Sequence, residues 1–360
     1  MNLLSFFDYG ITVATVSLLG IGFAVLVSTS PTLVGNFILF IIVGIIGFIT
    51  FATIDYRQWS RFRWVFYVGS LLLLVSLFFA PSIRGSTRWI DVGIFRIQPS
   101  ELIKPLVVII LASIISKEKK TTLFSFFKHA VLLLPFLGLI FMQPDLGNVI
   151  VYIGTFLIME IMNGLSLKFV FLGTIGLGAF APLFWRILKE YQRVRILSFL
   201  NPEIDPAGTG YNALQAIIAI GSGQLWGLGL GRGTQSHLLF LPEYHTDFVF
   251  ASLVEELGFI GGLLVLTFYA LFLSRFLVAS KNADDSFGRL LALGLFAQLF
   301  IQVIINIGMN LGLLPITGIT LPLISYGGSS ILSTFINIGI LTSILALNRR
   351  RSPIVIGSRF

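Results

Sequence analysis

Long apolar stretches recur along nearly the whole chain, and they constrain its fold more than any other feature. Each is close to the length of about 20 residues that an α-helix needs to cross a bilayer. None shows the alternating pattern of an outer-membrane barrel strand. We therefore expect an all-α integral membrane protein in which residues 1–360 form a single membrane domain with about ten transmembrane helices, at residues 9–29, 33–53, 64–81, 101–116, 129–143, 147–163, 167–186, 247–274, 287–314 and 321–346.

Composition supports this class and excludes others. Hydrophobic residues make up 56% of the chain and charged residues 11%, which is more apolar surface than a soluble core absorbs. The absence of cysteine excludes disulfides and thiol chemistry. The net charge of +8 is not arranged as a basic stripe interleaved with aromatic residues, so we expect no nucleic-acid partner.

Lysine and arginine indicate the orientation, because the cytoplasmic side of a membrane protein retains positive charge. They predict that both termini are cytoplasmic, with a cytoplasmic tail at residues 348–360. In this arrangement a large extracytoplasmic loop, residues 186–246, lies between helices 7 and 8. Its glycine-rich run at residues 221–233 indicates close backbone approach and positive φ angles.

The most chemically informative segment is residues 241–248, where Glu243, His245 and Asp247 alternate just before the eighth predicted helix. The alternation places them on one side of an extended segment. A partly desolvated carboxylate there has the raised pKa that a general base needs. The alternative is that Thr246 or Asp247 only caps the helix that follows, and capping is the commoner role for this pattern.

Several arginines lie in the segments predicted to be outside the membrane. Guanidinium groups bind pyrophosphate through paired hydrogen bonds, although contact with lipid headgroups is the alternative. No second histidine lies near His245, which argues against a histidine metal site, whereas Mg²⁺ or Mn²⁺ held by carboxylates and bridging to a phosphate is compatible. We expect no organic cofactor. The candidate pyrophosphate-binding residues are Arg84, Arg88, Arg193, Arg195 and Arg232, with Glu243 and His245.

Other polar residues occur where helices begin. Glu101 and Lys104 are spaced to pair on one helix face, either as a structural ion pair or to shape the site, and Glu255 with Glu256 poses the same choice. Asp145 is either a site carboxylate or a helix cap. Ser100 is predicted to cap the fourth helix.

The junction before the last predicted helix, residues 315–330, carries prolines and glycines and includes Ser325. Backbone that is not helical is tolerated at membrane depth only where protein buries it or it lines a cavity, so this junction is predicted to wall a groove. Trp89 is typical of an interfacial anchor.

Together these segments resemble the SEDS family (shape, elongation, division and sporulation). The resemblance rests on the blocks at residues 84–90, 98–101, 143–147, 201–215, 241–248, 255–258 and 314–330, which follow the family order. It implies ten helices with cytoplasmic termini and a peptidoglycan glycosyltransferase that uses Asp247 as general base. Trp89, Glu101, Lys104, Asp145 and Ser325 are then supporting positions. Tyr244 departs from the small or basic residue expected at its position.

The resemblance also implies substrates and partners. The substrates would be lipid II and the nascent glycan strand, at the outer face of a bacterial cytoplasmic membrane. The partners would be a class B penicillin-binding transpeptidase and other membrane proteins of the elongation complex. Residues 233–236 favour the RodA branch over a division-specific FtsW-like role. Two other functions remain open, namely a transporter that flips lipid II and a scaffold without catalysis.

Overall fold

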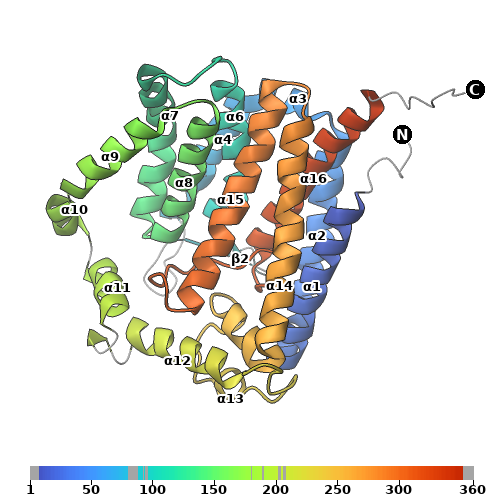
Figure 1. The fold of residues 1–360 in the computed structure, drawn as a ribbon, viewed down its shortest axis with the longest axis vertical. Helices are drawn as coiled ribbons and strands as arrows, with labels where there is room; N and C mark the ends of the chain where they lie inside the picture. The colour runs from blue at the N-terminus through green and yellow to red at the C-terminus, as the bar shows by residue number, and fades with distance from the viewer. Residues whose placement is uncertain are drawn as a thin grey trace, which may run out of the picture.

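The structure is a computed structural model that describes residues 8–79, 88–91, 93, 96–179, 181–188, 190–201, 204–205 and 208–351. Arg84 lies outside the described residues. Within them the chain is nearly all helical (Figure 1). Seven helical segments are long and apolar enough to cross a membrane, so this is a multi-pass membrane protein: Tyr9–Thr29, Pro31–Thr53, Tyr56–Phe79, Leu123–Met142, Val249–Asn282, Ser286–Asn310 and Gly328–Leu347.

The labelled helices are α1 (Tyr9–Thr29), α2 (Val34–Thr53), α3 (Tyr56–Trp59), α4 (Arg63–Ser76), α5 (Pro99–Leu102), α6 (Lys104–Ile115), α7 (Leu123–Met142), α8 (Leu146–Met162), α9 (Leu167–Ala179), α10 (Ala181–Ile187), α11 (Glu190–Leu200), α12 (Thr209–Ser222), α13 (Thr234–His237), α14 (Val249–Asn282), α15 (Ser286–Asn310) and α16 (Gly328–Arg351). Short 3₁₀ turns accompany α2, α3 and α4. Strands β1 (Ile90–Asp91) and β2 (Arg96–Ile97) pair antiparallel, with Ile90 opposite Ile97.

The predicted count of ten spans is not confirmed. Two of the predicted spans are the shorter apolar helices α6 and α8, and the predicted span 167–186 is divided into α9 and α10. The predicted span 101–116 is likewise divided, because α5 ends at Leu102 and α6 begins at Lys104. Length and apolar composition of the sequence therefore located these segments without fixing their continuity.

The last two predicted spans had wrong boundaries. α15 ends at Asn310 and α16 begins at Gly328, whereas the sequence predicted 314 and 321 for these ends. The linker between them, residues 311–327, is longer because Pro315 and Pro322 lack the amide hydrogen that a helix uses. Gly312 and Gly318 in this linker adopt φ angles of 69° and 75°.

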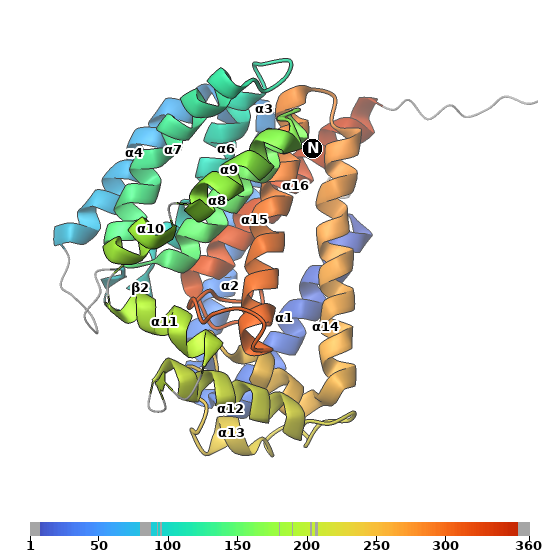
Figure 2. The ribbon, with the colours of Figure 1, turned by 60° about the vertical axis from the view of Figure 1, so that its left-hand side comes forward.

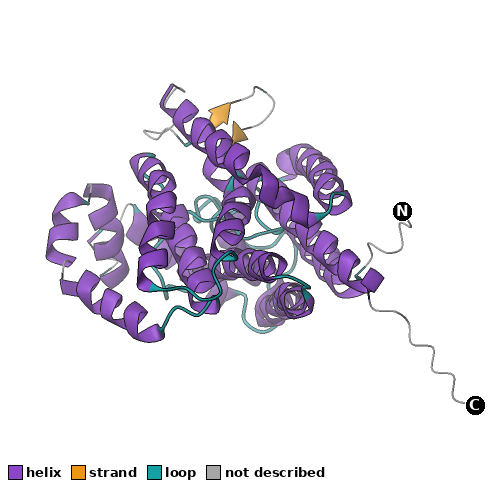
Figure 3. Cartoon of the chain, turned by 90° about the horizontal axis from the view of Figure 1, so that it is seen from above, coloured by secondary structure: helices purple, strands orange, loops and turns teal. Residues whose placement is uncertain are grey.

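The bundle is built around α15 and α16, which are the most buried of its long helices. α16 packs along α2, and α15 packs between α14 and α8 (Figures 1 and 2). Glycine permits the close approach of α2 and α16, since a Cβ atom at Gly44 would lie 2.6 Å from the Phe335 ring. Seen from above, loops lie among the helices near the middle of the bundle (Figure 3).

The end of the bundle away from the chain termini carries α11, α12 and α13 (Figures 1 and 2). There the glycine-rich run contacts a break in α14 at Gly258, whose φ is 72°. Phe259 N donates to Gln224 O at 2.8 Å, and Leu228 N donates to Glu255 O at 3.0 Å. The predicted close approach is confirmed, because a Cβ atom at Gly227 would collide with the Glu256 carbonyl.

Candidate active site

Asp247 lies in a turn directly before α14, at the end of the bundle opposite the chain termini. The N-cap of α14 is Phe248, which makes no side-chain cap bond, so the interpretation of Asp247 or Thr246 as a cap is wrong. The expected extended segment is also wrong. Glu243 has a φ of 48°, and its carbonyl accepts hydrogen bonds from Thr246 N at 3.1 Å and Phe248 N at 3.2 Å.

Two asparagines of α15 hold the backbone of Asp247. The Nδ2 atoms of Asn306 and Asn310 each donate to the Asp247 carbonyl at 3.0 Å. Asn306 Nδ2 also donates to Ile319 O at 2.7 Å, and Asn310 Oδ1 accepts from Ala251 N at 3.0 Å. The sequence analysis did not identify this pair. Two amide side chains four residues apart in an apolar stretch were the available signal, because such groups form hydrogen bonds between membrane helices. The structure buries both completely.

The linker 311–327 packs against the same turn. Ser325 Oγ donates to Thr246 O at 2.6 Å and accepts from Leu321 N at 2.7 Å, while Tyr326 N donates to His245 O at 2.8 Å. Gly318 approaches the carboxylate itself, since a Cβ atom there would lie 3.4 Å from Asp247 Oδ2. The linker thus walls the space beside Asp247, and Ser325 ties it to the turn.

The surroundings of Asp247 raise its pKa from 3.8 to about 7. Burial is the largest cause, and the negative charge of Glu243 adds to it, whereas the positive charges of Arg195 and Arg88 oppose it. The side chain nevertheless keeps a partly exposed edge. A carboxyl group that is about half ionised at neutral pH, and that solvent reaches, is suited to accept a proton from a substrate.

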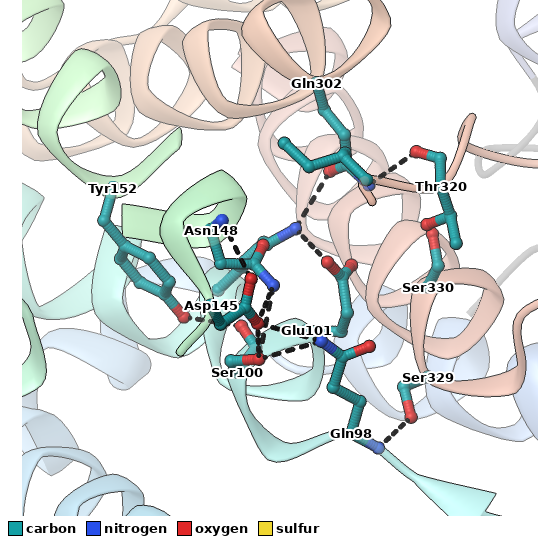
Figure 4. A network of polar contacts seen from close by, with 12 residues as sticks. Gln98, Ser100, Glu101, Asp145, Asn148, Tyr152, Gln302, Thr320, Ser329 and Ser330 are labelled. Carbon is teal, nitrogen blue, oxygen red and sulfur yellow. Dashed lines mark hydrogen bonds and ion pairs between the residues drawn. The ribbon is translucent and has the colours of Figure 1, made fainter. Parts of the chain in front are cut away.

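Asp145, whose negative charge also raises the pKa of Asp247, belongs to a buried polar network (Figure 4). Asp145 Oδ2 accepts from Gln98 Nε2 at 3.0 Å, Ser100 Oγ at 2.9 Å and Asn148 Nδ2 at 2.8 Å. Asp145 is also the N-cap of α8, which confirms the capping interpretation. The prediction that Ser100 caps a helix is wrong, because the N-cap of α5 is Gln98 and the Ser100 hydroxyl bonds to Asp145 instead.

The predicted pair of Glu101 and Lys104 is confirmed. Lys104 Nζ lies 2.6 Å from Glu101 Oε1 and 3.2 Å from Gln302 Oε1, and the Gln302 side chain in turn donates to Thr320 O at 3.2 Å (Figure 4). Both charged side chains are almost completely buried. The pair therefore connects α5 and α6 to α15 and to the linker that borders Asp247.

The structure brings together only part of the predicted arginine set. Arg88 and Arg195 interact electrostatically with Asp247. Arg88 is fastened to the turn before α8, with Nε donating to Gln143 O at 2.9 Å and Nη2 donating to Pro144 O. Arg193 instead donates to Arg186 O at 2.9 Å. Arg232 is exposed in the glycine-rich run, and Trp89 is half-buried before β1.

The turn before α14 also carries His245 and the carboxylates that were considered as metal ligands. Burial lowers the pKa of His245, and the charge of Glu243 partly offsets this, so the ring is neutral at pH 7. Among the described residues no three His, Asp or Glu side chains converge as metal ligands. Asp247 and Glu243 suit only the mode in which one or two carboxylates and the phosphates of a substrate hold Mg²⁺ or Mn²⁺.

Glu255 and Glu256 of α14 hold residues of the segment between α12 and α14. Glu255 accepts from Gln235 N at 2.7 Å and from Ser236 Oγ at 2.9 Å. Glu256 Oε1 accepts from Ser28 Oγ at 2.5 Å and lies 3.0 Å from His237 Nε2. Both carboxylates are buried and accept hydrogen bonds within the protein, so their contacts support the structural interpretation.

Comparison with known proteins agrees with this geometry. Residues 2–350 match the family model of cell cycle proteins that groups FtsW, RodA and SpoVE. The peptidoglycan glycosyltransferase MrdB of Escherichia coli K12 is 40% identical over 312 residues, which cover 84% of this chain and 83% of MrdB. The stage V sporulation protein E of Bacillus subtilis is 40% identical over 324 residues, covering 87% and 86% of the two chains.

Two solved structures share the fold. A chain from a study of how a peptidoglycan synthase complex coordinates polymerization and crosslinking superposes with a TM-score of 0.82 at 29% identity, covering 96% of this chain and 99% of that chain. The rod shape determining protein RodA of Thermus thermophilus gives a TM-score of 0.71 at 27% identity, covering 96% and 98%. With the match over residues 2–350, these similarities show that the chain belongs to the SEDS family of peptidoglycan glycosyltransferases.

Proposed function

We propose that this glycosyltransferase polymerises lipid II into β-1,4-linked glycan strands, with Asp247 as the general base. The observation that carries the assignment of the base is the pKa of about 7 at a side chain that is mostly surrounded by protein yet partly exposed. The Asp247 carboxylate accepts the proton of the 4-hydroxyl of the incoming GlcNAc. The hydroxyl oxygen bonds to the anomeric carbon of the growing strand, whose bond to the undecaprenyl pyrophosphate breaks with inversion.

The leaving pyrophosphate carries negative charge that needs stabilisation. The positive charges of Arg88 and Arg195 lower the pKa of Asp247, so both act on the site. We therefore assign these two arginines to binding the pyrophosphate. If a divalent cation binds, the carboxylates of Glu243 or Asp247 would hold it, and it would supply further positive charge for the leaving pyrophosphate. Asn306, Asn310 and Ser325 act indirectly, by fixing the backbone of residues 246–247.

The site faces the outside of the bacterial cytoplasmic membrane in this proposal, and both termini are cytoplasmic. The distribution of lysine and arginine along the sequence supports this orientation. We assign the enzyme to cell elongation, with a class B penicillin-binding transpeptidase as partner. The resemblance of residues 233–236 to the RodA branch supports the first assignment, and the similarity to a chain of a peptidoglycan synthase complex supports the second.

The test is a polymerisation assay with the purified full chain, with and without a candidate transpeptidase, in vesicles that contain fluorescent lipid II and Mg²⁺ or Mn²⁺. The proposal predicts a ladder of glycan strands on a gel, which a muramidase digests to short products. Accessibility of the fluorophore to an external quencher reports leaflet exchange in the same vesicles. Exchange of lipid II without any ladder, even with the partner, would favour a transporter over a polymerase.

A further inference from the structure

An apolar groove lies at the other end of the molecule, far from Asp247. Its volume is about 500 Å³, and it lies between α1 and α2 with α16 as its floor. The lining residues come from the first half of α1, the second half of α2 and the middle of α16. They include Ile11 and Val16 of α1, Ile45 and Ala52 of α2, and Phe335 and Thr342 of α16.

The groove extends over only half of the membrane thickness. On α2 it follows residues 45–53, which corresponds to about 12 Å at the rise of an α-helix. Half of the hydrocarbon core of a bilayer is about 15 Å. Towards the outer end the two helices close upon each other, where the ring centroids of Phe23 and Phe37 are 6.4 Å apart. A transmembrane helix of a partner would have to continue past this contact, whereas an acyl chain from the nearer leaflet ends before it.

The lining of the groove is almost entirely apolar, so it offers a ligand few groups for hydrogen bonds. Three of its threonines bond to their own helices, with Thr12 Oγ1 donating to Asp8 O at 3.0 Å, Thr53 Oγ1 to Ile49 O at 2.8 Å and Thr342 Oγ1 to Ile338 O at 2.8 Å. The hydroxyl of Thr15 is the remaining one. A ligand that needs several hydrogen bonds therefore does not fit this groove, but a hydrocarbon chain does.

Charge at the open end matches a membrane surface. Arg275 of α14 lies beside the first turn of α1, where its Nη2 is 2.6 Å from Asp8 Oδ2 and its side chain remains 26% exposed. Arginine side chains near helix ends reach the membrane interface, where lipid phosphates lie, and because Arg275 is already paired with Asp8 it would impose little choice of headgroup. The groove would therefore select its ligand by the acyl chain.

From these observations we propose that the groove binds one acyl chain of a phospholipid from the leaflet on the side of the chain termini, which is the cytoplasmic leaflet in the orientation given above. The bound chain fills the space between α1 and α2 and holds α1 in place. This matters to the site, because the other end of α1 contacts α14 and the turn before it: Ser28 Oγ donates to Glu256, and Ser30 Oγ donates to the Tyr244 hydroxyl. The lipid would be a structural ligand distinct from any substrate.

The experiment uses the full chain in vesicles of phosphatidylglycerol that contain a small fraction of a phospholipid with a diazirine in the middle of one acyl chain. After illumination, mass spectrometry locates the label. We expect labelling concentrated on residues 45–53 and 335–342, and enriched over the lipid-exposed face of α4. Ala52 lines the groove and is 5% exposed, so the ring introduced by Ala52→Phe would occupy part of it. Its labelling should fall roughly tenfold, the equivalent of losing the burial of about two methylene groups.

Ile42→Phe is the matched control, because Ile42 is 52% exposed on the same helix but lies outside the groove, and labelling should persist. If Ala52→Phe fails to fold, Val16→Trp at the 63% exposed rim tests the same point. Uniform labelling of all lipid-exposed helices, or labelling that the filled groove does not reduce, would overturn the proposal. Displacement by undecaprenyl phosphate but not by ordinary phospholipid would also overturn it, since the groove would then hold a polyprenyl chain.

Discussion

The ionisation of Asp247 should set how the reaction rate depends on pH. The pKa of this carboxyl group rises from 3.8 to about 7, which is roughly 4 kcal/mol of preference for the neutral form. A general base works only when it is ionised. With a pKa near 7, about a tenth of the molecules are ionised at pH 6 and about nine tenths at pH 8, so kcat/KM for glycan formation should rise roughly tenfold between these values.

The cause of the raised pKa can be tested at two neighbours of Asp247, because their removal should shift this pKa in opposite directions. The charge of Glu243 raises the pKa of Asp247, so Glu243→Gln should move the midpoint of the profile to lower pH. The charge of Arg195 lowers it, so Arg195→Gln should move the midpoint to higher pH. Because burial is the largest cause, each shift should be about one pH unit or less. Glu190→Gln on α11 removes an exposed carboxylate and serves as the control.

The assay is the initial rate of glycan formation from fluorescent lipid II between pH 5.5 and 8.5, with substrate below KM. A rate that does not change across this range would refute the reasoning. So would a Glu243→Gln midpoint that moves upward, since removing a negative charge beside a carboxylate cannot favour its neutral form by electrostatics alone.

Three further predictions concern the support of the site. Asn306→Leu removes one of the two amides that hold the Asp247 carbonyl, and it should lower kcat more than it changes KM while costing roughly 1–3 kcal/mol of stability, measured by steady-state kinetics and thermal melting. Lys104→Met leaves the buried Glu101 carboxylate without its cation and should destabilise the protein by roughly 3–5 kcal/mol, whereas Lys104→Met with Glu101→Gln should recover most of this in the same melts. The folded-state pKa of Asp247 is raised, so the cost of ionising it grows as pH rises from about 4 to 7 and is complete above 7; Asp247→Asn should therefore raise Tm relative to wild type at pH 8 and not at pH 4.

The sequence predicted best the helices whose bounds follow from the need to cross the hydrocarbon of a bilayer. The first span was predicted at residues 9–29, and α1 has the same bounds, because a chain in hydrocarbon must satisfy its backbone within one helix. The pair of Glu101 and Lys104 was predictable for a related reason. Their spacing lets each charge compensate the other where water is absent.

The surroundings of Asp247 depend on contacts between distant segments, and no local pattern reports them. Its neighbours Arg88, Asp145, Arg195 and Glu243 come from four segments of the chain, and burial changes its pKa most. The turn at Glu243 with a positive φ likewise replaced an extended segment that the alternation alone had suggested. The sequence therefore located Asp247 before the eighth helix, whereas the support of its backbone by α15 and by the linker 311–327 could not be predicted from the sequence.

The most direct test of the central claim compares glycan formation by the wild type, Asp247→Asn and Asp284→Asn under one condition. Asp284 lies on the surface near the chain termini, 3.2 Å from Arg57, and so controls for the loss of a carboxylate far from the site. The account predicts ladders from the wild type and from Asp284→Asn, and none from Asp247→Asn at equal folded protein and equal binding of lipid II. Ladders of normal rate from Asp247→Asn would contradict it, because another group would then have to accept the proton.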